Sequence, residues 1–390
     1  MPKSIDFASY AYYPCLQCSA GELLGYQHLD DADKGAIVPI FEVSCRPPAL
    51  ITELMEVVRK VVDGRPFILD LSHEPAPMPY VSGNPKDPEK DAKRVREQQE
   101  YKSTYDAELA ELLESRNGFE RWRKTVASFP QAIPVLQFND LLTEQRQILR
   151  QASLLLANGS QIAFRLRLED VNAAVPVVAQ ILSIVDDARK LLIIVDCGQG
   201  RQKLVERAAA ASNAILRIRD EIDLSQRSSL RSVCVSSSFT QPPGPYPRDY
   251  ENYEPELWRA ASEVFSFLLG DYAATYRRVS TTTYIPDEWV ASVVCPLDDI
   301  WLVYRDQNQK DPDGWTKGAA AITRQGKYKD FGRLPGVWGD EVIQRAKEKN
   351  IDGVSSARFW HAVKVNIHIH RQIRAAPQRI KEYAASDSED

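Results

Sequence analysis

The chain has 390 residues, of which 44% are hydrophobic and 26% are charged, which is enough for a large buried core. Its net charge of −5 argues against nonspecific binding of nucleic acid, which needs a basic surface. No apolar run of about 18 residues predicts a membrane span, and the first residues lack the apolar stretch of a signal peptide. We therefore expect a cytoplasmic protein that does not bind membranes.

Short apolar segments, rich in β-branched residues, alternate with segments of helical periodicity along most of the chain. This alternation is typical of a parallel sheet, and the near-continuous apolar character suits strands that are covered on both faces. The predicted strands are 36–43, 66–71, 132–138, 162–168, 191–197, 214–218 and 233–239.

Helical patterns occupy the intervening segments 49–62, 141–158, 171–188 and 201–212. Seven strands with crossover helices favour a closed barrel over an open sheet. An open, doubly wound sheet usually carries a glycine-rich turn after its first strand, whereas the first predicted strand here is followed by SCRPP. The predicted fold is therefore α/β, a (β/α)8 TIM-barrel-like domain that spans residues 1–285.

Residues 72–128 interrupt the alternation after the second predicted strand, and we interpret them as a long insertion. A proline-rich polar segment, 72–91, leads into a long charged helix over 92–128. In a barrel this insertion lies on the face where the strands end, as a lid or an arm that docks a partner. A flexible loop without a specific role is the alternative.

The pattern changes again near residue 286, which predicts a small α+β part over 286–380 that completes or caps the barrel. It contains a strand pair within 288–306, helical segments at 317–331 and 340–350, and a strand over 359–370. The acidic tail, 381–390, is predicted to be disordered.

Polar residues lie at the predicted strand ends, where the functional site of a (β/α)8 barrel is found. Carboxylates can act as general acids and bases, and arginine forks bind phosphate or carboxylate groups. The rim therefore predicts either a site for an anionic ligand or an internal ion network that satisfies buried charges. The proposed ligand-binding residues are Glu42, Asp70, Gln137, Arg165, Arg167, Asp196 and Ser237. Further polar residues at predicted strand ends are Asn139, Arg217, Arg219, Ser236 and Ser238.

A second candidate cluster comprises Trp360, His368 and His370 near the end of the chain. On a strand the two histidines would share one face, as an acid–base pair would. No HExxH pattern accompanies them, and no second cysteine pair completes the Cys15-x-x-Cys18 spacing into a zinc site. We predict no metal and no cofactor, and no residue is assigned as catalytic.

Several segments, in order over nearly the whole chain, resemble the phage Beta protein family. The opening YYPCLQCSAGELLGYQHL and the IVPIFEV that follows resemble its start, where a tyrosine–proline segment and a Gly-Glu pair precede the first barrel strand. Later landmarks are PFILDL, IAFRLRL, LLIIVDCG, SSSF, LLGDYAATY, WGDEVI and FWHAVKVNIHIH. The family usually ends in a tryptophan–arginine pair and adjacent histidines. Here His361 follows Trp360, and Ile369 separates His368 from His370, which argues against a required catalytic pair.

The resemblance implies a setting rather than a reaction. Beta proteins occur in phages, satellite phages and bacterial mobile elements, and one cassette pairs Beta with a toxic partner that it restrains in anti-phage defence. One hypothesis is thus a regulatory, antitoxin-like protein that acts through a protein partner, either a toxin or another defence component. The alternative is an enzyme or sensor whose barrel rim binds a nucleotide or phosphorylated ligand. Whether the chain is an enzyme stays open.

Overall fold

Eight parallel strands form a ring in the computed structural model, which describes residues 4–79, 87–239, 248–275, 289–353 and 355–386. The strand order is β4-β3-β2-β1-β9-β7-β6-β5. A parallel bridge between Val135 and Ala163 brings the two outer strands together, and Leu136 N donates to Ala163 O at 2.8 Å. The strands are β1 (Tyr13–Leu16), β2 (Ile40–Val43), β3 (Phe67–Leu71), β4 (Ala132–Pro134), β5 (Ile162–Arg167), β6 (Leu191–Gln199), β7 (Arg231–Ser237) and β9 (Leu268–Asp271).

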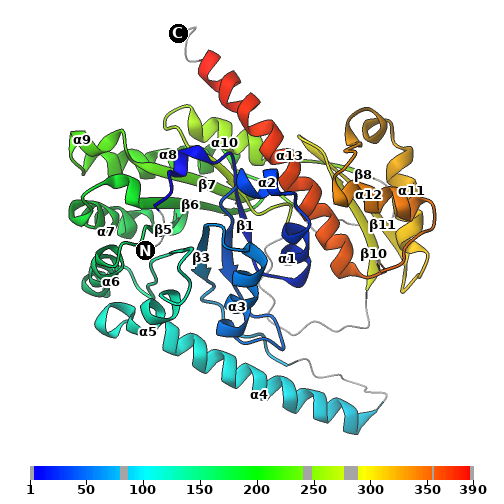
Figure 1. Cartoon of the computed structure of the whole chain (residues 1–390), viewed down its shortest axis with the longest axis horizontal. Helices are drawn as coiled ribbons and strands as arrows, with labels where there is room; N and C mark the ends of the chain where they lie inside the picture. Colours follow the sequence, from blue (N-terminus) through cyan, green and yellow to red (C-terminus); the bar gives the residue numbers. More distant parts are fainter. Residues whose placement is uncertain (1–3, 80–86, 240–247, 276–288, 354, 387–390) are drawn as a thin grey trace.

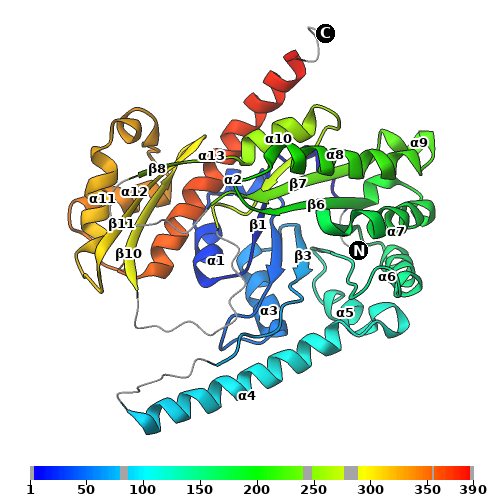
Figure 2. The ribbon, with the colours of Figure 1, turned by 180° about the vertical axis from the view of Figure 1, so that it is seen from behind.

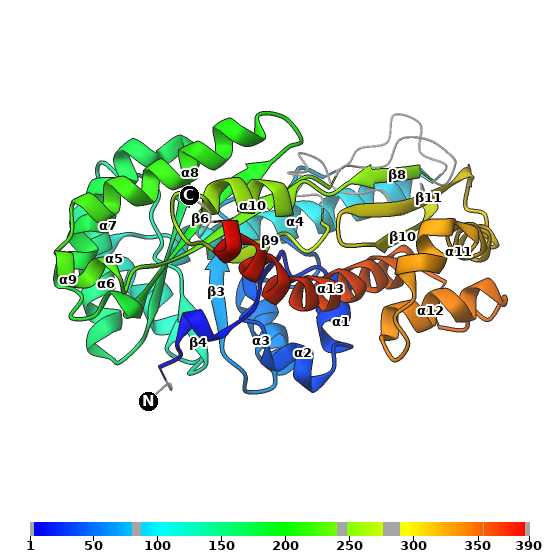
Figure 3. The ribbon, with the colours of Figure 1, turned by 90° about the horizontal axis from the view of Figure 1, so that it is seen from above.

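Helices surround this ring, so the strands are buried on both faces (Figures 1 and 3). Inward side chains such as Ile40, Ile68 and Val233 fill the barrel, while outward ones such as Phe41 and Leu69 pack against the helices. The predicted TIM-barrel-like fold is confirmed. The surrounding helices are α1 (Ala20–Gln27), α2 (Asp31–Gly35), α3 (Ile51–Val62), α5 (Arg116–Val126), α6 (Gln145–Ala157), α7 (Val171–Ile184), α8 (Leu204–Asp220), α9 (Leu224–Arg227), α10 (Glu254–Ser262) and α13 (Ala357–Ser386).

Two details of the predicted barrel are wrong. The segment 214–218 is part of α8, and its apolar residues Ala214, Ile215 and Ile218 form the buried face of that helix. Two strands of four residues each, β1 and β9, complete the ring instead. The tyrosine–proline segment is thus itself the first strand, and the insertion 72–128 follows the third strand of the barrel, β3, rather than the second.

The insertion contains a long helix, α4 (Pro88–Leu112), whose N-terminal end lies away from the barrel and whose C-terminal end leads into α5 (Figures 1 and 2). The predicted single helix over 92–128 is therefore two helices. The buried residues of α4 are Tyr105, Leu109 and Leu112, near its C-terminal end. One half of α4 is thus anchored to the barrel and the other half is largely exposed.

A three-stranded antiparallel sheet, in the order β10-β11-β8, lies beside the barrel (Figure 1). The predicted strand pair within 288–306 corresponds to two of its strands, and the third comes from the loop after β7. The strands are β8 (Arg248–Glu251), β10 (Val290–Pro296) and β11 (Ile300–Gln309), and the helical segments that accompany them are α11 (Gly314–Arg324), η4 (Tyr328–Gly332) and α12 (Trp338–Lys347). The predicted domain boundary at residue 285 lies outside the described residues.

The predicted strand over 359–370 is wrong, because this segment belongs to the helix α13. Val363 and Ile367 pack in the core of the antiparallel sheet, whereas Val365 and Ile369 pack against the barrel. The helix thus joins the two parts. The predicted tail 381–390 overlaps its end, and residues 387–390 lie outside the described part of the chain.

Two glycines allow α13 to approach α1 closely. A Cβ atom at Gly21 would lie 2.9 Å from the carbonyl oxygen of Arg358, and one at Gly25 would lie 2.8 Å from that of Ala362. Any larger residue would push the helices apart. Within the described residues, no helix has both the length and the apolar character that crossing a lipid bilayer requires.

Candidate functional site

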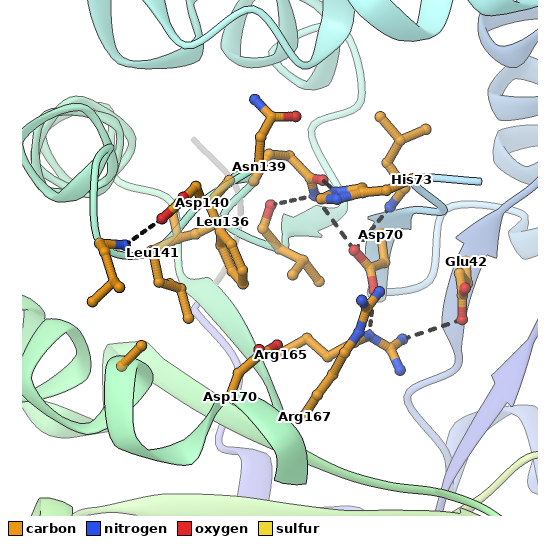
Figure 4. A pocket seen from close by; sticks show the side chains of 16 residues that line it. Glu42, Asp70, His73, Leu136, Asn139, Asp140, Leu141, Arg165, Arg167 and Asp170 are labelled. Carbon is orange, nitrogen blue, oxygen red and sulfur yellow. Dashed lines mark hydrogen bonds and ion pairs between the residues drawn. The ribbon is translucent and has the colours of Figure 1, made fainter. Parts of the chain in front are cut away.

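Arg165 on β5 is the centre of a buried ion network inside the barrel mouth (Figure 4). Its Nε donates to Asp70 Oδ2 at 2.6 Å, and its Nη1 donates to Asp196 Oδ2 at 3.0 Å. Its Nη2 lies 3.6 Å from Glu42 Oε2, and Tyr272 Oη donates to Asp196 Oδ2 at 2.7 Å. Burial alone would lower the pKa of Arg165, but Asp70 and its other neighbours raise it well above its usual value.

Strand periodicity explains why these residues meet. Side chains two positions apart face the same side of a strand, so Glu42 follows Ile40 into the barrel and Asp70 follows Ile68. Glu42 and Asp70 are register partners on adjacent strands. The network therefore forms a polar layer above the apolar interior of the barrel.

Gln137 and His73 extend this network toward solvent. The amide nitrogen of Gln137 donates to Asp70 Oδ1 at 3.4 Å and to Val135 O at 3.0 Å, which fixes the orientation of the amide. The amide oxygen lies 2.8 Å from His73 Nε2 and accepts a hydrogen bond from the N–H group at that position. In a neutral imidazole, Nδ1 of His73 is then the acceptor. His73 immediately follows Ser72 in the long insertion and was not predicted as a site residue.

A cavity of about 340 Å³ opens above this layer, at the ends of β3, β4 and β5. Arg167, two residues beyond Arg165, faces the cavity and has no hydrogen bond or ion pair with any described residue. Burial raises the pKa of the neighbouring Asp170, and Arg167 opposes this shift. Of the predicted rim residues and further polar positions, the lining includes Glu42, Asp70, Gln137, Asn139, Arg165 and Arg167.

The remaining predicted rim residues lie elsewhere. Asp196 contacts Arg165 but does not line the cavity, and Ser237 Oγ donates to Thr275 O at 2.9 Å. Arg217 and Arg219 are on α8, outside the barrel, because the strand predicted there is a helix. Ser238 is engaged through both its backbone nitrogen and its hydroxyl with Glu254, at the start of α10.

The predicted C-terminal cluster does not come together as one site. Trp360 stacks on Trp315 in the core of the antiparallel sheet, with ring centroids 5.7 Å apart. His368 contacts Asp271 at 2.8 Å, whereas His370 contacts Asp33 on α2 at 2.6 Å. On a helix, residues two positions apart point in nearly opposite directions, so the two histidines do not form a pair.

His368 instead belongs to a second buried network that attaches α13 to the barrel. Asp271, at the end of β9, accepts hydrogen bonds from Tyr12 and from Ala273 N, in addition to its contact with His368. Burial alone would raise the pKa of Asp271, but His368 and the other donors hold it below its usual value. Burial and the charge of Asp271 raise the pKa of Glu254 to about 7.

The chemistry of the rim favours binding over catalysis by the network itself. Both oxygens of Asp70 and of Asp196 accept hydrogen bonds inside the protein, so these carboxylates are already engaged. Burial raises the pKa of Cys15, below Arg165, to about 12, so this thiol remains protonated. Cys18 belongs to the core outside the barrel, so the CxxC cysteines do not form one site. The groups suited to contact a ligand in the cavity are Arg167 and His73.

The sequence is similar to known proteins over almost its whole length. The model of the family described as "Beta protein" matches residues 12–374. The chain is 26% identical over 372 residues to "Protein beta" of Enterobacteria phage P4, and this match covers 95% of the chain and 94% of that protein. Matches of this extent span the barrel, the antiparallel sheet and most of α13. The chain therefore belongs to the Beta protein family.

Proposed function

We propose that this chain is a regulatory protein of a phage or mobile element that acts in the cytoplasm through a protein partner. The partner is a toxin or another component of an anti-phage defence system, which the chain restrains as an antitoxin does. The observation that carries the proposal is the half-anchored helix α4. The phage relative and the cassette setting implied by the family support the regulatory role.

The C-terminal half of α4 is tied firmly to the barrel. Glu108 accepts hydrogen bonds from the backbone nitrogens of Ile51 and Thr52, so it caps the start of α3. Tyr101 donates to Ala49 O at 2.9 Å. The N-terminal half, from Pro88 to Glu100, contains no buried residue and carries charges of both signs. A charged helix with one exposed half suits docking to another protein, because a backbone that is already ordered loses little conformational entropy on binding.

The exposed half of α4, from Pro88 to Glu100, is here called the arm. It can be shortened without disturbing the anchored C-terminal half of the helix. Ala76 N donates to Asp106 at 2.8 Å, and Ala76 O accepts from Lys102 at 2.6 Å, so the chain lies next to the anchored half of α4 at this point. Replacing residues 79–99 with a short glycine–serine linker keeps these contacts. This shortened variant is co-expressed with the proteins that are encoded beside the chain. It should no longer co-purify with its partner and should no longer protect the cell from toxicity.

A matched control keeps the arm and exchanges one of its ion pairs. Swapping the exposed pair in a K93E/E97K variant preserves helix charge and length. If this variant also loses the partner, the pattern of charges on the arm carries recognition. Full partner binding by the shortened variant, with an unchanged melting temperature, would refute the docking role of α4.

The cavity supports a second function, as a sensor or enzyme site for a nucleotide or phosphorylated ligand. Arg167 presents a guanidinium that has no partner among the described residues toward a space of about 340 Å³, and such forks bind phosphate groups. Binding of a panel of nucleotides can be measured calorimetrically with the wild type, R167Q and R217Q. Arg217 is the matched control, because it lies outside the barrel, where it donates a hydrogen bond to the side chain of Asn172. Equal nucleotide binding by all three proteins would show that the cavity at Arg167 is not the binding site.

A further inference from the structure

Two walls of the cavity at Arg167 are attached to the anchored half of α4. The first wall follows β4 and includes Asn139, which lines the cavity (Figure 4). The side-chain nitrogen of Asn139 donates to the carbonyl oxygen of Leu113 at 2.9 Å, and Leu113 is the C-cap residue of α4. This wall is therefore tied directly to the end of the helix.

The second wall follows β3 and is connected to α4 through Ala76. His73 lines the cavity, and three residues later the backbone of Ala76 contacts two side chains of α4. The nitrogen of Ala76 donates to Asp106 Oδ1 at 2.8 Å, and its oxygen accepts from Lys102 Nζ at 2.6 Å. Lys102 Nζ also lies 2.7 Å from Asp106 Oδ2. The pair of Lys102 and Asp106, here called the Ala76 clamp, thus holds the segment that carries His73.

The docking of α4 on the barrel depends on a small amount of packing. Three of its 25 residues are buried, namely Tyr105, Leu109 and Leu112. Segments with few buried apolar contacts open locally at a lower free energy than the core of a protein does. Besides the docked state of the structure, α4 therefore has an open state of higher free energy. The open state lacks the contacts of α4 with Asn139 and Ala76.

We propose that a phosphorylated ligand in the cavity controls α4, and through α4 the binding of the protein partner. The inference rests on the proposed ligand function of the cavity. A ligand whose phosphate group contacts Arg167 occupies a space between walls that docked α4 holds in place, so it binds the docked state more tightly than the open state. By linkage, it shifts α4 toward the docked state. Because docked α4 presents the arm, ligand and partner strengthen each other's binding.

Hydrogen exchange of α4, measured by mass spectrometry on the full chain, tests this coupling. The probe is AMP, and its dissociation constant is first measured by calorimetry. At about ten times that constant, AMP should slow the exchange of the amides in residues 101–112 by roughly tenfold, because it stabilises the docked state by this factor. R167Q should lose the effect, and R217Q, outside the barrel, should keep it.

Two variants of α4 separate the coupling from a general loosening of the helix. K102A/D106A removes the Ala76 clamp, and neither residue lines the cavity. This variant should still bind AMP but should lose at least half of the slowing. Y101F is the matched control, because it removes a contact of α4 with Ala49 O instead. It should exchange faster than the wild type without AMP and should keep the full slowing with AMP.

The outcomes distinguish a failure of the coupling from a failure of the cavity. Binding of AMP to the wild type without slower exchange in α4 would overturn the coupling and leave the cavity as a ligand site. Equal slowing in the wild type and in K102A/D106A would overturn it as well. If the wild type does not bind AMP, or R167Q binds it equally well, the ligand function of the cavity fails and the coupling fails with it.

Discussion

Two polar regions at the same end of the barrel differ in how their charges are satisfied. Around Arg165, one guanidinium contacts three carboxylates and a tyrosine, all of them buried. At the wall of the nearby cavity, Arg167 faces a space of about 340 Å³ and makes no hydrogen bond or ion pair with a described residue. A network whose charges are matched internally supports the fold, whereas an unpaired guanidinium beside a cavity is available to bind an anion. Arg165 therefore belongs to the architecture of the barrel, and Arg167 belongs to the candidate site.

The largest expected effect comes from removing the cation of the matched network. R165M leaves Glu42, Asp70 and Asp196 buried without their counter-charge, which should lower the free energy of unfolding by about 3–5 kcal/mol. Urea denaturation measures this change. R167M, at the cavity wall, should cost less than about 1 kcal/mol. A similar small loss for R165M would show that the network does not support the barrel.

A second prediction uses the pH dependence of stability. The pKa of Glu254 is raised from 4.5 to about 7 in the folded protein, so the folded state holds the proton more tightly than the unfolded state does. Its contribution to stability is present below about pH 4.5 and is lost as the pH rises to about 7, at about 1.4 kcal/mol per pKa unit. E254Q should remove this part of the slope between pH 5 and 7 in urea titrations. An unchanged slope would assign the effect to another group.

A third, smaller effect tests how closely α13 packs against α1. G25A places a Cβ atom 2.8 Å from the carbonyl oxygen of Ala362, and overpacking of this kind costs about 1–3 kcal/mol. G35A is the matched control, because no atom lies within 4 Å of its Cβ position. The two melting temperatures should differ clearly, and equal values would mean that α13 can shift without cost.

The barrel could be predicted because its long strands are buried on both faces. The segment 191–195, for example, is a continuous apolar run for that reason. β1 and β9 are too short for this signal, and Pro14 interrupts the first of them. The helix α13 was mistaken for a strand because it packs between two cores. Val363 and Ile367 face one core and Val365 and Ile369 face the other, so alternate positions are apolar, as they are in a strand.

The residues of the candidate site could be predicted wherever the strands that carry them could be predicted. Strand parity brings Glu42, Asp70 and Arg165 together, and this follows from the sequence once the strands are known. Arg217 was misplaced together with its strand. His73 carries no comparable signal, because it lies beyond the end of its strand in a proline-rich segment without periodicity.

The packing of α13 against both cores has a further consequence for the protein while it is being synthesised. The last outer helix of the barrel is made after the antiparallel sheet, so Val365 and Ile369 reach the barrel only after its strands and those of the sheet have been synthesised. Until then the nascent chain exposes apolar surface on both the barrel and the sheet, a state prone to aggregation and proteolysis. Messages cut short before residue 357 would yield a product without either core complete, which the cell should degrade.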